Sequence, residues 1–376
     1  MSNPRKCWGT CALQAWGMAI AIAFQIGLAG SRVHATPTVV AWGDITNTPG
    51  QISSVSQLVA GESINAVVRN DGTIDEWRST GAPQVWNTNV YAVTFGTYQS
   101  YYSILELKTN RTLGMPFLYA PPPPAGATNP IAIASGQNQF LVLKGDGTIV
   151  AWGLGFTNYM SEISNVVAIA SGESHYVALK NDGTVTAWIN SARTNVYTNV
   201  PPGLSNVVAI AAGDGFTMAL RRDGSLVAWG VPGSPATNVP AGLSNVVAIA
   251  CGSYHALALK NDGTVATWGD NSFNELGMPV GLTNVTLIAA REGHSLAVVD
   301  PQPSPGIVIS GSTLKSNAFS VSIPSISGRV YYLEYATDVN AINWTPLPLV
   351  AGTGDTLMIQ DTNLADQQRF YRVRRW

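Results

Sequence analysis

Three of the four histidines stand at one place in a recurring pattern, and an imidazole can act as a general base or a metal ligand. They are His175, His255 and His294, each three residues after a glycine or the residue that replaces it. The other units place Ile64, Gln99, Gln139 and Phe216 at this position. A catalytic or metal site needs its groups close together, whereas equivalent repeat positions are spread over separate structural units. We therefore expect a structural hydrogen-bonding role for these histidines, and we expect neither a metal nor a cofactor.

Carboxylates follow the same turns. The residue after the glycine, or after its replacement, is acidic in four of the units, and gathered like charges raise the local negative potential. Tyrosines and polar groups stand beside these acids, a mixture typical of binding surfaces. Solvated turns also favour such residues, so a purely structural origin stays open. The candidate binding residues are Glu62, Tyr98, Gln137, Glu173, Asp214, Tyr254 and Glu292.

Two of these carboxylates could instead form an acid–base pair of a glycosidase, which needs its carboxyl groups roughly 5–10 Å apart. No copy is singled out by a supporting His or Arg, so non-catalytic binding is the first hypothesis. An extracellular carbohydrate-active enzyme and a structural cell-envelope protein remain the alternatives. The chain carries no nucleophile elbow, phosphate loop or zinc helix motif, and the spacing of Asp355, Asp361 and Asp366 matches no calcium loop.

An internal repeat must position these residues. The stretch NVVAIASGESHYVALKNDGTVTAW over Asn165–Trp188 returns, with changes, over Asn206–Trp229 and Asn245–Trp268. The period is roughly 38 residues, and a degenerate copy occupies Val90–Leu113. Each unit predicts an apolar strand, a second strand, an Asp-Gly hairpin turn and a third strand. One tryptophan recurs in six units, which predicts core packing on an inner strand; it is Trp42, Trp77, Trp152, Trp188, Trp229 and Trp268.

The ends of the periodic region each hold half a repeat. Val39–Gly43 matches the tail of a unit, and Glu292–Val299 matches a front half. Pairing these two segments would close a ring and leave only short strand edges. We therefore predict an all-β fold with a seven-bladed propeller over residues 36–301, closed by its N-terminal strand. The acidic turns would surround one mouth of its central channel.

The repeat V-V-A-I-A-S-G-E-S-H-Y-V-A-L-K-N-D-G-T-V-T-A-W resembles the RCC1 (regulator of chromosome condensation) repeat. Asp270–Gly277 is similar to the last eight positions of the family's G-x-N-x-x-G-Q-L-G stretch, with changes at its sixth and seventh positions. The resemblance covers about residues 36–301 and implies a propeller. Nucleotide exchange on a nuclear GTPase, the family's founding activity, does not carry over to an exported and non-basic chain. Secreted bacterial members, which include a β-lactamase-inhibiting propeller, imply protein binding instead.

The two ends of the chain predict separate segments. Arg5 and Lys6 precede an apolar run, and Val33-His34-Ala35 forms a cleavage site, so residues 1–35 are predicted to be a signal peptide. A membrane anchor is disfavoured by polar and glycine residues in that run. The mature chain would be secreted, periplasmic or held at the cell surface. Residues 302–305 predict a Pro-rich linker. Residues 306–376 predict a small β-sandwich that loosely resembles fibronectin-type modules and could dock the protein to a surface.

Composition limits the classes of partner. Charged residues make up 11% of the chain and the net charge is −2, with no long basic stretch, so nucleic acid is excluded as a partner. Only Cys251 would survive cleavage, which excludes an intramolecular disulfide and a cysteine zinc site. A small buried residue is the expected role of Cys251. We expect a monomer whose partner is a protein or a glycan.

Overall fold

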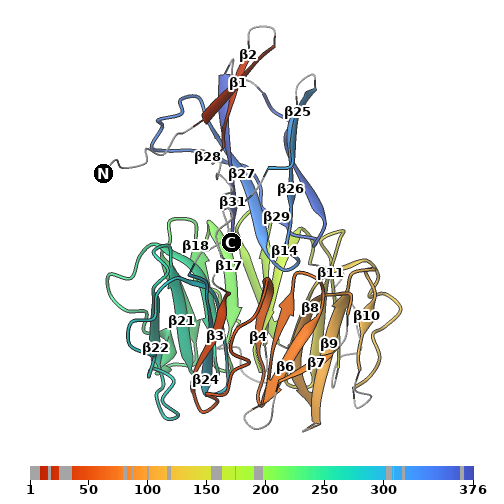
Figure 1. Ribbon diagram of the computed structural model, residues 1–376, viewed down its shortest axis with the longest axis vertical. Helices are drawn as coiled ribbons and strands as arrows, with labels where there is room; N and C mark the ends of the chain where they lie inside the picture. Colours follow the sequence, from red (N-terminus) through yellow and green to blue (C-terminus); the bar gives the residue numbers. More distant parts are fainter. Residues whose placement is uncertain are drawn as a thin grey trace.

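The computed structural model shows a body of small sheets with a β-rich module on one end (Figure 1). No helix of the described part is long and apolar enough to cross a membrane. Its helical turn is the 3-10 segment η1 (Pro235–Thr237). The all-β fold predicted from the sequence is therefore confirmed. The structure describes residues 9–15, 18–24, 36–78, 83–86, 88–99, 101–116, 120–153, 163–173, 175–189, 198–301, 307, 309–315, 318–364 and 368–376.

The described residues between 38 and 299 form seven antiparallel sheets, one for each repeat unit. The first sheets contain β4 (Val55–Ala60), β5 (Ile64–Arg69), β6 (Ile74–Arg78) and β7 (Gln84–Trp86); β8 (Val90–Tyr98), β9 (Tyr101–Lys108) and β10 (Leu113–Gly114); and β11 (Pro130–Gly136), β12 (Gln139–Lys144) and β13 (Ile149–Gly153). Next come β14 (Val166–Ser171), β15 (His175–Lys180) and β16 (Val185–Ile189); β17 (Val207–Ala212), β18 (Phe216–Arg221) and β19 (Leu226–Gly230); and β20 (Val246–Cys251), β21 (His255–Lys260) and β22 (Val265–Gly269). The last sheet joins β23 (Val285–Arg291), β24 (His294–Val299) and β3 (Thr38–Gly43).

The first strands of the sheets are the innermost ones, and they contact one another in circular order. The order runs from β4 through β8, β11, β14, β17 and β20 to β23, and β23 contacts β4 again. The N-terminal β3 completes the last sheet by pairing antiparallel with β24, from His294 opposite Gly43 to Val299 opposite Thr38. The predicted pairing of the two half-repeats is therefore confirmed, and the ring leaves few open strand edges.

The Asp-Gly turns lie together at one end of the ring. In each of them an aspartate oxygen accepts hydrogen bonds from the N–H and the hydroxyl of the residue two positions later; for Asp182 and Thr184 these measure 2.9 and 2.7 Å. In the degenerate unit Asn110 makes the same pair of bonds to Thr112. We call this end the Asp-Gly face; its turns hold Asp71, Asn110, Asp146, Asp182, Asp223 and Asp262.

The recurring tryptophans pack the core, but they do not lie on inner strands as predicted. They lie on the third strand of each sheet, for example Trp77 on β6 and Trp268 on β22. Loops of the preceding unit cover them: Trp268 Nε1 donates to Ala236 O at 2.9 Å, and Trp42 Nε1 donates to Glu275 O at 2.7 Å. A large ring on an outer strand is thus buried because a loop supplies both cover and an acceptor.

The C-terminal module has two sheets around one core. One sheet contains β25 (Gly311–Lys315), β26 (Ala318–Pro324) and β30 (Thr356–Asp361). The other contains β27 (Val330–Ala336), β28 (Thr345–Pro346), β29 (Val350–Ala351) and β31 (Gln368–Arg375). Apolar side chains from both sheets meet between them, among them Phe319, Tyr331 and Ile359. The strand predicted at Asn343–Trp344 begins later, at β28, because the Trp344 ring turns back to donate to Ala341 O.

Two predicted terminal segments stay predictions. Within residues 1–35 the structure describes β1 (Gly9–Ala15) and β2 (Met18–Phe24), which pair with each other, and β2 lies parallel to β31. This pairing does not test cleavage of a signal peptide. The predicted linker over residues 302–305 lies outside the described residues.

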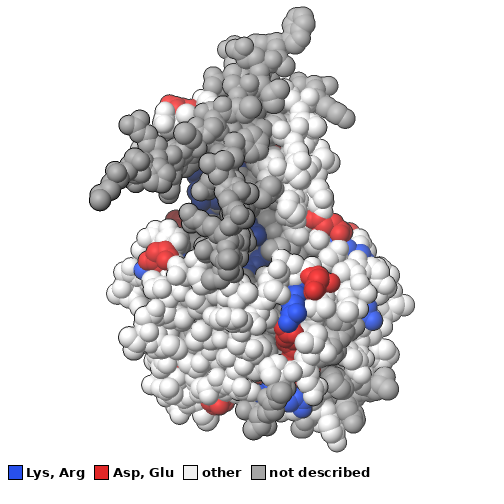
Figure 2. Space-filling view, viewed as in Figure 1, with Lys and Arg blue, Asp and Glu red and all other residues white. Residues whose placement is uncertain are grey.

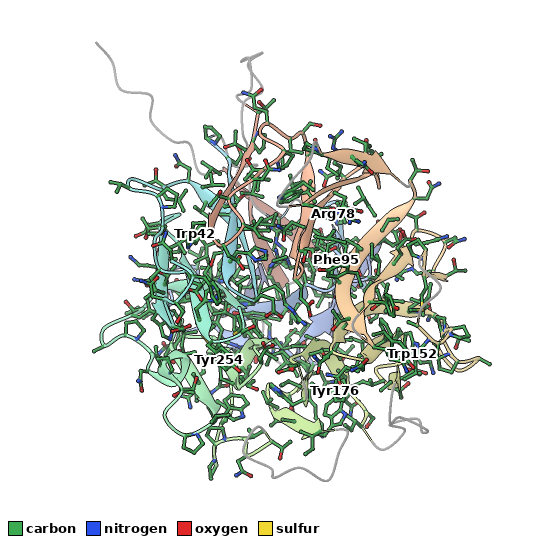
Figure 3. The ribbon with its side chains drawn as sticks, turned by 90° about the horizontal axis from the view of Figure 1, so that it is seen from below. Trp42, Arg78, Phe95, Trp152, Tyr176 and Tyr254 are labelled. Atoms are coloured by element: carbon green, nitrogen blue, oxygen red, sulfur yellow. The ribbon has the colours of Figure 1, made fainter. Side chains whose placement is uncertain are left out.

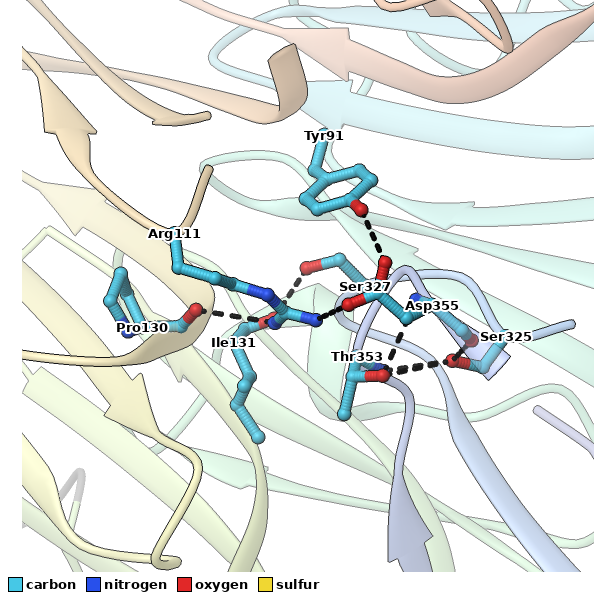
Figure 4. Close-up of polar contacts among 8 residues, drawn as sticks. All are labelled: Tyr91, Arg111, Pro130, Ile131, Ser325, Ser327, Thr353 and Asp355. Atoms are coloured by element: carbon cyan, nitrogen blue, oxygen red, sulfur yellow. Dashed lines mark hydrogen bonds and ion pairs between the residues drawn. The ribbon is translucent and has the colours of Figure 1, made fainter. Parts of the chain in front are cut away.

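The module sits on the Asp-Gly face (Figure 1). Its Val330, Tyr332 and Leu349 belong to an apolar cluster with residues of β17 and β18. The Leu349 N–H donates to Asn181 O at 2.9 Å. Asp355 accepts hydrogen bonds from Tyr91 Oη and Arg111 Nη2 at 2.6 and 2.5 Å (Figure 4). Few charged side chains mark the wall of the ring below the module (Figure 2). One end of the channel is therefore covered from within the chain.

Candidate functional site

The glycine turns form a tight ring at the opposite end of the channel. A Cβ atom added to Gly136, Gly172 or Gly213 would lie 2.0, 2.2 or 2.4 Å from the carbonyl oxygen of the glycine in the next unit. Side chains are excluded there by this close approach of neighbouring backbones. We call this end the glycine-turn mouth. Its turns are Gly61–Glu62, Gly96–Thr97, Gly136–Gln137, Gly172–Glu173, Gly213–Asp214, Gly252–Ser253 and Arg291–Glu292.

Hydrogen bonds between units hold the candidate residues around this mouth. The Asp214 N–H donates to Ser253 O at 3.1 Å, and the Ser253 N–H donates to Glu292 O at 3.1 Å. On the other side Gln139 Nε2 donates to Glu173 O at 3.0 Å. Glu62, Tyr98, Glu173, Asp214 and Glu292 are half-buried, whereas Gln137 and Tyr254 are exposed. The structure therefore places the candidates on one continuous surface.

The carboxylates of the mouth act on one another. Burial, followed by the charges of Asp214 and Glu62, raises the pKa of Glu292 above its usual value. Ser253 Oγ donates to Glu292 Oε2 at 3.1 Å, and Arg291 Nε lies 3.8 Å from Glu292 Oε1. Sequence reasoning missed Arg291 as a member of the site. The available signal was an arginine at the one unit that replaces the turn glycine.

Aromatic side chains border the mouth. Tyr254 is 50% exposed, Tyr101 is 55% exposed and Phe273 is 59% exposed. Seen from below, Phe95 lies toward the centre of the ring and Tyr254 lies farther out (Figure 3). The Phe273 ring covers Gly293, where an added Cβ would meet it at 2.9 Å. Phe273 was also missed, although it falls inside the Asp270–Gly277 stretch.

A small cavity lies at the mouth, among residues that the structure describes. A cavity of only about 10 Å³ lies between Glu62, Tyr102 and Arg291. Small-molecule sites usually enclose about 300–1,000 Å³. No group of three or more His, Cys, Asp or Glu side chains among the described residues could hold a metal ion. This geometry suits contact with another surface.

The repeat histidines join neighbouring units. His175 Nε2 lies 2.8 Å from Thr217 Oγ1, His255 Nε2 lies 2.9 Å from Ser295 Oγ, and His294 Nε2 lies 2.9 Å from Asn65 Oδ1. The last pair links the end of the ring to its beginning. Burial lowers the pKa of His175 and of His255 to about 4.

Two further sequence predictions concern Gln99 and Cys251. Gln99 was placed at the histidine position of the degenerate unit, and this assignment is wrong. The β8–β9 hairpin extends to the Tyr98–Tyr101 pair, so Ser103, opposite Gly96, takes that position. Cys251 is buried, as predicted, and burial raises the pKa of its thiol. A buried thiol of this kind is unreactive.

Comparisons with known proteins agree with this geometry. Residues 166–188, 207–232 and 246–275 match the profile of the "Regulator of chromosome condensation (RCC1) repeat". A search of curated proteins finds no match. The structure of Prp20p from Saccharomyces cerevisiae is similar at 15% identity and a TM-score of 0.57, covering 72% of this chain and 93% of that one.

Two other solved structures are similar. Yeast RCC1 (Prp20), in its complex with Kap60, has 14% identity and a TM-score of 0.56, covering 75% of this chain and 96% of its own. Human WBSCR16 has 15% identity and a TM-score of 0.50, and the match covers 68% of this chain and 89% of the WBSCR16 chain. Identities this low speak for the fold alone. The chain therefore carries RCC1 repeats and has the β-propeller fold of the RCC1 proteins.

Proposed function

We propose that this protein is an exported, non-catalytic binding protein whose glycine-turn mouth contacts a basic segment of a protein partner. The observation that carries the proposal is the combination of half-buried carboxylates with exposed aromatic rings on the end of the ring that the C-terminal module leaves open. Exposed aromatic rings are the usual anchors of a protein interface, and charged groups around them supply electrostatic complementarity to the partner. Export rests on the signal peptide predicted for residues 1–35.

The electrostatics of Glu292 support a role in binding. Its raised pKa means that the folded protein disfavours the charged carboxylate, so this charge is held at a cost to the fold. Asp214 and Glu62 add to that cost by repulsion. A cationic partner would relieve the repulsion, which makes the cluster complementary to a lysine or arginine side chain.

The fold is compatible with protein binding. Prp20p, which has this propeller fold, binds Gsp1p and histones. A glycan partner is the weaker alternative, because sugars stack on aromatic rings but need no cluster of carboxylates. The enzyme hypothesis would need a cleft with two carboxylates set apart from the rest, and the small cavity at the mouth gives it no support.

The proposal can be tested by pull-down from the native secretome with the immobilised full chain. The site variant combines Glu62→Gln, Glu173→Gln and Asp214→Asn, which removes three charges with little change in shape. We expect the variant to recover the basic partner at least tenfold less well, and we expect added salt to weaken wild-type binding.

A matched control removes the same charge from the other end of the ring. It combines Asp146→Asn, Asp182→Asn and Asp262→Asn, because Asn110 shows that asparagine supports the same turn. The control should bind as the wild type does. Equal binding by the site variant would reject this mouth as the site, and release of sugar from a polysaccharide panel would favour the enzyme instead.

A further inference from the structure

The covered end of the channel holds a second feature, which is independent of the glycine-turn mouth. A turn of the module, Ser325–Arg329, projects toward the channel, and Ser327 Oγ donates to Ile131 O of β11. Neighbouring contacts of Ser325, Thr353 and Asp355 hold this turn in place (Figure 4). The turn is therefore fixed to the inner strands.

Between the turn and the inner strands lies a cavity of about 250 Å³. This is far above the ~10–15 Å³ that a single water molecule needs. Strands β4, β11, β14 and β23 all line it, so the cavity lies on the channel itself. Most of the lining is aliphatic or backbone, and its polar side chains are Ser56, Gln57, Ser327 and Arg329.

Arg329 is the charged side chain of this lining. None of the ion pairs found among the described residues joins Arg329 to a carboxylate. The charged side chain with the largest electrostatic effect on Arg329 is a second cation, Arg375. Burial and Arg375 both lower the pKa of Arg329. A guanidinium still keeps its proton, because its usual pKa exceeds 12. The cation is thus held in the channel with no counter-charge from the described chain.

Gln57 adds hydrogen-bond donors to the same cavity. Its Oε1 accepts the Val93 N–H at 2.9 Å, which fixes the orientation of the amide. Its Nε2 carries two N–H donors, and Gln57 is one of the residues that line the cavity. A guanidinium fork together with amide donors matches an oxyanion, whose oxygens accept several hydrogen bonds at once.

We propose that this cavity binds a small oxyanion, with Arg329 as its charged contact and Gln57 as a second donor. The shared chemistry is a phosphate, a sulfate or a carboxylate group small enough for 250 Å³. Such an anion would neutralise a cation that is otherwise costly to hold away from bulk water.

Isothermal titration of the full chain with inorganic phosphate, and separately with acetate, at constant ionic strength tests the proposal. Arg329→Gln should weaken anion binding at least tenfold, and Arg329→Lys should weaken it less, because charge remains without the fork. Arg374→Gln is the matched control, since Arg374 belongs to the same module but pairs with Glu334 at 2.9 Å. It should bind the anion as the wild type does.

Each result of these titrations either supports or rejects the anion site. Binding of phosphate alone identifies a tetrahedral oxyanion, and binding of acetate as well identifies a carboxylate-type ligand; both support the site. No saturable binding of either anion by the wild type would overturn it, and so would an Arg329→Gln variant that binds as tightly as Arg374→Gln. Circular dichroism shows whether Arg329→Gln is folded, and Arg329→Lys carries the test if it is not.

Discussion

Single histidines link the units of this ring, and their burial ties the stability of the fold to pH. His175 and His255 each contact a hydroxyl of the next unit through Nε2, and each is fully enclosed. With a folded pKa of about 4 against an unfolded value of 6.5, the unfolded chain takes up protons first as the pH falls. The stabilising contribution of each buried histidine is therefore fully present above pH 6.5 and is lost as the pH falls toward 4.

This predicts that each of the two histidines removes about 2 kcal/mol of unfolding free energy between pH 7 and pH 5. The variant His175→Gln with His255→Gln should lose that dependence, because glutamine does not titrate. Glutamine is tolerated at this repeat position, as Gln139 shows by donating to Gly172 O at 3.1 Å. Urea denaturation at both pH values measures the unfolding free energy of each protein. An equal loss of unfolding free energy between pH 7 and pH 5 in wild type and variant would contradict the prediction.

Ionisation of Glu292 should affect the stability of the fold in the direction opposite to that of the two histidines. Its raised pKa means that the charged form destabilises the fold, so Glu292→Gln should leave the unfolding free energy at pH 7 unchanged or raise it slightly. Glu334 is the control: it is buried and accepts from Arg372 and Arg374, so Glu334→Gln should cost about 3 kcal/mol or more. Chemical denaturation at pH 7 compares the two. A destabilised Glu292→Gln variant would show that the glutamate is structural.

The structural roles of residues in regular repeat units could be predicted from the sequence, and those of residues in irregular units could not. Equivalent positions such as His175 and His255 share one environment, so a single pattern describes both. Gln99 was misplaced because the β8–β9 hairpin is longer than its equivalents, which shifts the count from the glycine to the next strand. Arg291 is a member of the mouth only because its unit lacks the glycine, a departure from the pattern that carries no chemistry by itself.

At the scale of elements, β3 is the strand that closes the ring. It pairs with β24 over six residues, and Trp42 packs with Leu257 and Leu259 of the preceding sheet. The two halves of one sheet thus come from opposite ends of the periodic region. The sequence could predict this pairing because the half-repeats complement each other, but it could not place the tryptophans, since the covering loops have no repeated pattern.

Removal of the Trp42 ring should therefore destabilise the whole ring. We expect Trp42→Ala to cost about 3–5 kcal/mol, because the side chain is 2% exposed and its Nε1 donates to Glu275 O. Val85 on β7 is 64% exposed, so Val85→Ala should cost less than about 1 kcal/mol. Thermal and urea unfolding of both variants checks this contrast; similar losses would mean that β3 does not seal the ring.

For the whole molecule, the docked module decides which end of the propeller is open. Its apolar cluster and the Asp355 contacts cover the Asp-Gly face and leave the glycine-turn mouth exposed. The repeat pattern predicted the ring, and the loss of that pattern predicted a separate C-terminal module. It did not predict the docking, because Leu349 and Asp355 meet residues of distant units whose side chains face this end only after folding.

The apolar contacts should dominate this docking. Leu349 is 3% exposed, so Leu349→Ala should cost about 2–5 kcal/mol. The side chain of Asp355 is 59% exposed, and an exposed ion pair contributes about 0–1 kcal/mol, so Asp355→Asn should cost little. Hydrogen exchange of the amide of residue 349, which bonds to Asn181 O, reports undocking while β15 amides report global unfolding. We expect exchange at residue 349 to rise at least about 30-fold in Leu349→Ala and at most about 5-fold in Asp355→Asn, with β15 unchanged. The reverse order would mean that charge, and not burial, holds the module over the channel.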